Sequence, residues 1–140
     1  MIEVFFYGLF MDSELLERLG YPGDDPRVCV LADYDLRIGK RVTLVPSAGH
    51  RVHGVVMRMP YDRASQLYSL DMVKGYAPRD VRVSLTNKAM LDAVCYLLPE
   101  ADLAAANHDY AQSLYELSER LGFPGDYLAT IDAYRRTVQD

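Results

Sequence analysis

The sequence predicts an α+β fold, with strands in the first two thirds of the chain and helices in its tail. Short runs rich in β-branched and aromatic residues, separated by Gly, Pro and Asn, recur as far as Pro99. After Asn107, apolar residues recur at the spacing of a helix. The 140 residues, 50% of them hydrophobic, suit one domain with a sizeable core. Because the sequence contains no internal repeat or low-complexity linker, we expect a single domain over residues 1–140.

The N-terminal segment predicts a strand, a tight loop and a short helix. Residues 2–7 are mostly β-branched or aromatic and too few for a buried helix, which favours an interior strand. Gly8 allows the backbone to turn after this strand. Asp12 or Ser13 can accept hydrogen bonds from the first N–H groups of a helix, and Gly20 ends that helix.

The middle of the chain is expected to form several more strands around one helix. The strands are predicted over residues 27–38, 42–45, 50–59, 79–86 and 89–98. Asp62 is expected to cap a helix over residues 62–73, which Gly75 ends. Apolar residues recur every three positions along this helix, at Ala64, Leu67, Leu70 and Val73.

The tail predicts two helices joined by a turn that contains Gly and Pro. Asn107 is expected to cap the first helix, which ends at Gly122. A second helix is predicted over residues 127–138. The apolar face of the first helix consists of Tyr110, Leu114, Leu117 and Leu121.

Charge and hydropathy exclude two classes of partner. A formal net charge of −5, with no long basic run, is not that of a nucleic-acid-binding protein. No apolar run approaches the roughly 18 residues that a membrane-spanning helix requires. The N-terminus lacks the basic region of a secretory signal, so we expect a cytoplasmic protein.

The histidines and cysteines do not predict a metal site or a cofactor. His50 and His53 are three residues apart in a predicted strand, so their side chains point to opposite faces, and we expect both to be exposed. Cys29 and Cys95 lie in apolar runs and are expected to be buried free thiols.

The opening loop is the first candidate site. It consists of Tyr7, Gly8, Leu9, Phe10 and Met11, between a strand and a helix. Backbone N–H groups at such a junction can point outward and bind a carboxylate or a phosphate. The alternative is a simple turn with no ligand.

The end of the predicted middle helix is the second candidate site. Asp71 and Lys74 are three residues apart and therefore share a face of that helix. The alternative is a surface ion pair, which is worth only a few tenths of a kcal/mol.

The order of these motifs resembles the gamma-glutamyl cyclotransferase-like superfamily, which includes AIG2-like proteins and gamma-glutamylamine cyclotransferases. The opening loop "FYGLFM" matches the Tyr-Gly loop of that family, and "LDMVKG" over residues 70–75 is similar to its Leu-Asp-x-x-Glu-Gly helix end. The runs "VLADYDLRI", "VHGVVMRMP", "VRVSL" and "AVCYLL" follow in the family's order, as does the tail "YAQSLYELSERLGFPGDYLATI". The resemblance implies a small mixed β-barrel with surrounding helices and a cavity at one mouth.

The resemblance also implies a reaction and a set of site residues. In the family, the α-amino group of a gamma-glutamyl compound attacks its own side-chain amide, which releases 5-oxoproline. The opening loop holds the substrate, and the Glu before the helix-ending Gly accepts the proton from the ammonium group. Here that position is Lys74, and Leu9 replaces a small hydroxyl residue of the loop. Asp71 or Asp80 could act as a relocated base.

Three functions follow from this departure. The protein is a gamma-glutamyl cyclotransferase with a relocated base, or it binds a small anionic metabolite without converting it, with Lys74 as the counter-ion. The third is other chemistry on the same scaffold, or a surface that binds a protein partner.

Overall fold

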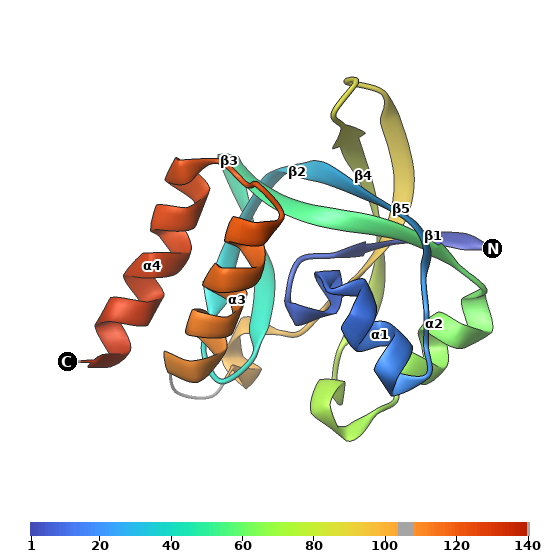
Figure 1. Ribbon diagram of the computed structural model, residues 1–140, viewed down its shortest axis with the longest axis horizontal. Coiled ribbons are helices and arrows are strands. Elements are labelled where there is room, and N and C mark those ends of the chain that lie inside the picture. The colour runs from blue at the N-terminus through green and yellow to red at the C-terminus, as the bar shows by residue number, and fades with distance from the viewer. Residues whose placement is uncertain (104–107, 140) are drawn as a thin grey trace.

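A computed structural model describes residues 1–103 and 108–139, and its centre is a closed five-stranded barrel (Figure 1). The strands are β1 (Ile2–Phe6), β2 (Asp24–Ile38), β3 (Val42–Met59), β4 (Ala77–Leu85) and β5 (Met90–Leu97), in the order β1-β3-β2-β4-β5. The α-helices in the described part of the chain are α1 (Ser13–Leu19), α2 (Tyr61–Leu67), α3 (His108–Arg120) and α4 (Gly125–Gln139). Short 3₁₀ helices cover Leu9–Met11, Asp71–Val73 and Glu100–Asp102. The mixed β-barrel with surrounding helices is therefore confirmed.

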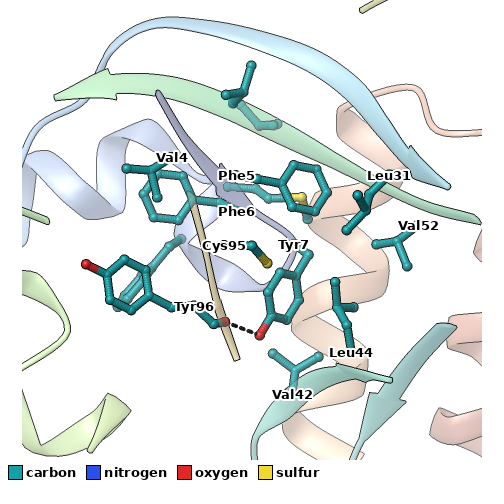
Figure 2. Close-up of a cluster of buried hydrophobic side chains, with 14 of the residues drawn as sticks. Val4, Phe5, Phe6, Tyr7, Leu31, Val42, Leu44, Val52, Cys95 and Tyr96 are labelled. Atoms are coloured by element: carbon teal, nitrogen blue, oxygen red, sulfur yellow. Dashed lines mark hydrogen bonds between the residues drawn. The ribbon is translucent and has the colours of Figure 1, made fainter. Parts of the chain in front are cut away.

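Strand β1 makes the barrel both mixed and closed. It pairs antiparallel with β3 from Ile2 to Phe6 and parallel with β5, where Val4 lies opposite Val94. β1 has a neighbouring strand on each side, and its residues Val4, Phe5 and Phe6 are buried, as expected for an interior strand. Phe5 and Phe6 are among the largest fully buried side chains, and Figure 2 shows them in the core.

The N-terminal helix forms as expected from its local signals. The Asp12 carboxylate accepts a hydrogen bond from the Glu14 N–H at 3.0 Å, and Gly20 adopts a left-handed conformation with φ of 90° at the other end. The 3₁₀ helix before it was not expected.

The prediction of two separate strands over residues 42–45 and 50–59 was wrong, because β3 runs without a break. This strand pairs with β2 on both sides of an irregularity: Tyr34 lies opposite Pro46, and the pairing resumes with Ala32 opposite Arg51. A register shift between Ala32 and Tyr34 places Asp33 at φ of 65° and lets the pairing continue. Since β1 pairs only with residues 55–59 of β3, Pro46 lies on an edge, where proline is tolerated.

The predicted helix over residues 62–73 is also wrong in its extent. α2 ends at Leu67, and the 3₁₀ helix Asp71–Val73 follows after a break at Leu70, which is extended. Asp62 lies in the first turn and does not cap the helix. The Tyr68 ring stacks on the Tyr96 ring with centroids 3.9 Å apart, a contact between distant segments that helical spacing does not reveal.

The helical tail packs beside the barrel, with α3 and α4 next to each other (Figure 1). The expected cap Asn107 lies outside the described residues. His53, expected to be exposed, is partly buried between the rings of Phe123 and Tyr127, at 5.6 Å and 4.8 Å between centroids. His50 is exposed, as expected.

The cysteines are buried free thiols, as predicted. Burial raises the pKa of Cys29 to about 12 and raises that of Cys95 further, so both are protonated at neutral pH. Among the described helices, none combines the length and the hydropathy needed to cross a bilayer.

Candidate functional site

A cavity of about 270 Å³ lies beside the opening loop. Its walls come from the loop, from α1, from the turn between β2 and β3, from the segment that follows α2, and from α3. The lining residues are Phe6, Tyr7, Gly8, Leu9, Phe10, Leu15, Lys40, Arg41, Val42, Tyr68, Met72, Val73, Tyr76 and Tyr110. Of the predicted loop residues, all but Met11 line this cavity; Met11 is buried in the core.

The sequence suggested that Gly8 is needed for a backbone turn, but the structure requires glycine here because there is no space for a side chain. Its φ of −111° and ψ of −150° are extended values that any residue can adopt. A Cβ atom at this position would lie 2.6 Å from the Tyr110 hydroxyl oxygen and 2.8 Å from Cγ1 of Val42. Gly8 therefore allows α3 and β3 to approach the loop closely.

The sequence suggested that the N–H groups of the loop point outward in a ring, but the structure does not have this arrangement. The Leu9 N–H donates to the Tyr110 hydroxyl at 3.3 Å. The N–H groups of Met11 and Asp12 donate to the carbonyl groups of Gly8 and Leu9, at 3.0 Å and 3.1 Å. Since the Leu9 and Met11 amides of the loop already have acceptors within the protein, the loop offers fewer N–H groups to an anion than its sequence suggested.

Tyr110 is a site residue that the sequence did not identify. It lies 101 residues from Leu9 along the chain, and its position on the apolar face of a helix predicted only a core role. Burial raises the pKa of Tyr110, so its hydroxyl is neutral at physiological pH.

Tyrosines form much of the remaining wall. The Tyr7 hydroxyl donates to the Tyr96 carbonyl at 2.7 Å (Figure 2), and the Tyr76 hydroxyl donates to the Val42 carbonyl. Burial raises the pKa of Tyr7 and of Tyr76, which keeps both hydroxyl groups protonated. Because these hydroxyl groups are neutral donors with backbone partners, they shape the wall and are unsuited to act as bases.

Two cations contribute the charge of the cavity. Lys40 and Arg41 line it from the turn between β2 and β3. Arg41 Nη1 donates to the backbone carbonyl of Lys74, which fixes the guanidinium against the segment after α2. The exposed Lys74 side chain does not line the cavity. Lys74 thus acts on the site through its backbone in this structure.

The two aspartates predicted as relocated bases are not brought together. Asp71 is exposed, directly before the lining residues Met72 and Val73, but does not itself line the cavity. Asp71 and Lys74 form no ion pair, although both are described; the Lys74 N–H instead donates to the Asp71 carbonyl at 3.3 Å. Asp80 lies on β4 opposite Val94, in a different hollow that Glu3 also lines.

In the described part of the chain, no Asp or Glu side chain lines the cavity. Two cations at an otherwise apolar and aromatic cavity favour an anionic ligand, because Coulomb attraction is stronger where water is excluded. The same arrangement offers no carboxylate to accept a proton from a bound ammonium group.

Comparison with solved structures defines the class of protein as gamma-glutamyl cyclotransferase-like in fold. The chain is similar to a gamma-glutamyl cyclotransferase with a TM-score of 0.78 and 20% identity, over 94% of this chain and 86% of that one. It is similar to a glutathione-specific gamma-glutamyl cyclotransferase from yeast with a TM-score of 0.64 and 15% identity, over 96% of each chain. An AIG2-like protein from Mus musculus matches with a TM-score of 0.60 and 14% identity, over 78% and 90% of the two chains. At these identities the likeness shows the fold alone.

A match to a protein-family model identifies the family of this chain. The model described as gamma-glutamyl cyclotransferase, AIG2-like, matches residues 4–120, and the chain therefore belongs to this family. The match includes the opening loop, Lys74 and Tyr110, and it ends before α4. No curated protein matches the sequence.

Proposed function

We propose that this protein binds a small gamma-glutamyl compound in the cavity beside Gly8 and does not convert it. One observation carries the proposal: Lys40 and Arg41 line the cavity, and no carboxylate among the described residues does so. Membership of the gamma-glutamyl cyclotransferase family supports the gamma-glutamyl part of the ligand.

The carboxylate of the ligand is bound by the two cations. Arg41 is the principal partner, because its contact with the Lys74 carbonyl already holds the guanidinium in place and reduces the entropy lost on binding. Lys40 is exposed and adds a second positive charge. The tyrosine wall supplies a shaped surface with neutral hydroxyl groups.

The lack of a carboxylate beside these two cations, in the described part of the chain, disfavours conversion of the ligand. Cyclisation requires a neutral α-amine, and a bound ammonium group has no carboxylate at the cavity to accept its proton. Loss of a general base lowers a rate by a factor of about 10²–10⁴. With the family's Glu position occupied by Lys74, the protein is a binding module built on an enzyme fold.

Calorimetry with gamma-glutamylalanine tests the binding part of this proposal. Arg41→Met should weaken binding at least about tenfold, since hydrogen bonds to charged groups are worth about 1.5–3 kcal/mol. Arg82→Met is the matched control, because Arg82 is exposed on β4 and lines the other hollow. Equal affinity in wild type and Arg41→Met would contradict the proposal.

Mass spectrometry tests the absence of turnover. No 5-oxoproline should be released from gamma-glutamylalanine or a panel of gamma-glutamyl amines. The second candidate, a cyclotransferase with Asp71 as its base, is favoured by the position of Asp71 directly before two lining residues. It predicts that 5-oxoproline is released and that Asp71→Asn abolishes the release.

The cytoplasm is the expected compartment for this function. Cys29 and Cys95 are free thiols, which fits a reducing environment.

A further inference from the structure

Apart from two cations and the tyrosine hydroxyls, the described side chains that line the cavity are not polar. The inference drawn from this lining rests on the function proposed above. The other lining side chains are apolar or aromatic, and Gly8 has none. Leu9 and Phe10 come from the opening loop, Leu15 from α1, and Met72 from the 3₁₀ helix that follows α2. Two segments far apart in the sequence, residues 9–15 and the 3₁₀ helix that contains Met72, thus contribute apolar groups to one cavity.

Met72 is the most unusual of these residues. Its exposed fraction is 56%, which makes it one of the few large hydrophobic side chains on the described surface, and it lines the cavity as well. An exposed methionine is adaptable, because its thioether chain can rotate to cover an apolar ligand. Burial of Met72 against a ligand would remove apolar surface from water, which is favourable.

The cations and the apolar residues come from different elements of the wall. Lys40 and Arg41 belong to the turn between β2 and β3, whereas Leu15 and Met72 belong to helical segments outside the barrel. A ligand that uses both kinds of group has a carboxylate and a separate apolar part.

A cationic group beyond the α-ammonium that every gamma-glutamyl compound carries has no carboxylate partner among the described residues at this cavity. Since no described Asp or Glu lines the cavity, a second ammonium group would lose water without gaining an ion pair. Lys40 and Arg41 would repel it as well. A ligand whose amine part is lysine-like is therefore disfavoured.

We infer that the gamma-glutamyl compound bound in this cavity carries a large apolar group on its γ-amide nitrogen, as in a conjugate of an aromatic or branched aliphatic amino acid. The volume of about 270 Å³ is close to the lower end of the range for small-molecule sites, about 300–1,000 Å³. It suits a dipeptide-sized conjugate. Leu9, Leu15 and Met72 cover its apolar group, and Arg41 binds a carboxylate.

Calorimetry with three probes tests this inference. Gamma-glutamylphenylalanine should bind at least about tenfold more tightly than gamma-glutamylglycine, because its Phe side chain is removed from water on binding and the glycine conjugate has no such group. Gamma-glutamyl-ε-lysine should bind no more tightly than gamma-glutamylglycine.

Two methionine variants test whether the preference for the phenylalanine conjugate arises at the cavity. Met72→Gln keeps the length of the side chain and should weaken binding of gamma-glutamylphenylalanine about fivefold, with little effect on gamma-glutamylglycine. Met90→Gln is the matched control, because Met90 is 52% exposed on β5 and does not line the cavity. Both positions are exposed, so neither variant should unfold the protein.

The outcomes separate this inference from the proposed function. Equal affinity for the phenylalanine and glycine conjugates would overturn the inference and leave the proposed function intact. Failure of all three probes to bind would overturn both. Equal loss in Met72→Gln and Met90→Gln would also overturn the inference, since the effect would then not arise at the cavity.

Discussion

The cavity beside Gly8 and the hollow that Asp80 lines differ in whether their charged side chains have partners of opposite charge. In the hollow, Glu3 lies 2.5 Å from Arg27 and 3.6 Å from Arg58, and Asp92 lies 3.2 Å from Arg82. In the cavity, Lys40 and Arg41 face apolar and aromatic groups with no lining carboxylate among the described residues. An overall charge of −5 thus coexists with a cavity of the opposite sign. Glu3 and Asp92 at the hollow are thus paired with arginines, whereas Lys40 and Arg41 have no carboxylate partner among the described residues that line the cavity.

Gly8→Ala should have the largest effect, which arises at the wall of the cavity. The new methyl group would lie within 3 Å of the Tyr110 hydroxyl and of Val42, so we expect a loss of about 1–3 kcal/mol in the free energy of unfolding from overpacking. Binding of gamma-glutamyl compounds should fall with it. Urea unfolding and calorimetry measure the two effects.

Gly125→Ala is the control for that variant. A Cβ atom at Gly125 would meet nothing within 4 Å, so stability should change little. If Gly8→Ala were as stable as Gly125→Ala, the close approach of α3 and β3 to the loop would not be a constraint.

Glu3→Gln should lower stability by about 1 kcal/mol and leave ligand binding unchanged. The Glu3 side chain is 15% exposed and pairs with Arg27, and a neutral amide replaces a charge-assisted hydrogen bond with a weaker one. Asp92→Asn, in the exposed pair with Arg82, should change the unfolding free energy by less than about 0.5 kcal/mol. A change in ligand affinity in Glu3→Gln would mean that the two regions are coupled.

Tyr110→Phe should cost up to about 1 kcal/mol and weaken ligand binding through the loop. It removes the acceptor of the Leu9 N–H while keeping the ring. In the Gly8→Ala background the same change should cost less or even restore stability, because the hydroxyl oxygen that the new methyl group meets is gone. A double-mutant cycle by urea unfolding measures this coupling, and strictly additive effects would contradict it.

The stability of the protein should depend on the protonation of His53, which lines neither the cavity nor the hollow. Burial against Phe123 and Tyr127 lowers the pKa of His53 in the folded state, despite the nearby Asp126 carboxylate. The unfolded chain then binds more protons between that lowered pKa and about 6.5, so stability falls as pH falls through about 6.5. Because one histidine binds one proton, this loss cannot exceed about 1.4 kcal/mol per pH unit.

His53→Gln should flatten this part of the pH profile. His50→Gln, at an exposed position on the same strand, is the control. The pH series is measured by thermal or urea unfolding, and a decline that survives in His53→Gln would assign it to other groups.

Local chemistry made several elements predictable. Asp12 and Gly20 are strong helix-end residues whose effect depends on the next few backbone groups, and α1 begins and ends beside them. The apolar run at residues 2–7 predicted an interior strand, and β1 pairs with β3 on one side and β5 on the other. The helical tail follows from its apolar spacing in the same way.

Other elements depended on pairing between distant segments. Separate strands were predicted over residues 42–45 and 50–59, but β3 continues between them, and it pairs with β2 up to Pro46 and again from Arg51. Helical spacing continued through Val73, but the stacking of Tyr68 on Tyr96 accompanies an earlier end to α2. Propensities describe a few neighbouring residues, and such contacts override them.

The sequence by itself determined the strand-rich and helical parts of the chain, the opening loop and the buried thiols. Only the tertiary structure decided that Tyr110 lies against Gly8, that Arg41 is fixed by the Lys74 carbonyl, and that Asp80 lies in another hollow. The reason is physical: the sign and polarity of a cavity depend on which side chains the closed barrel brings together, and these are separated by up to about a hundred residues along the chain.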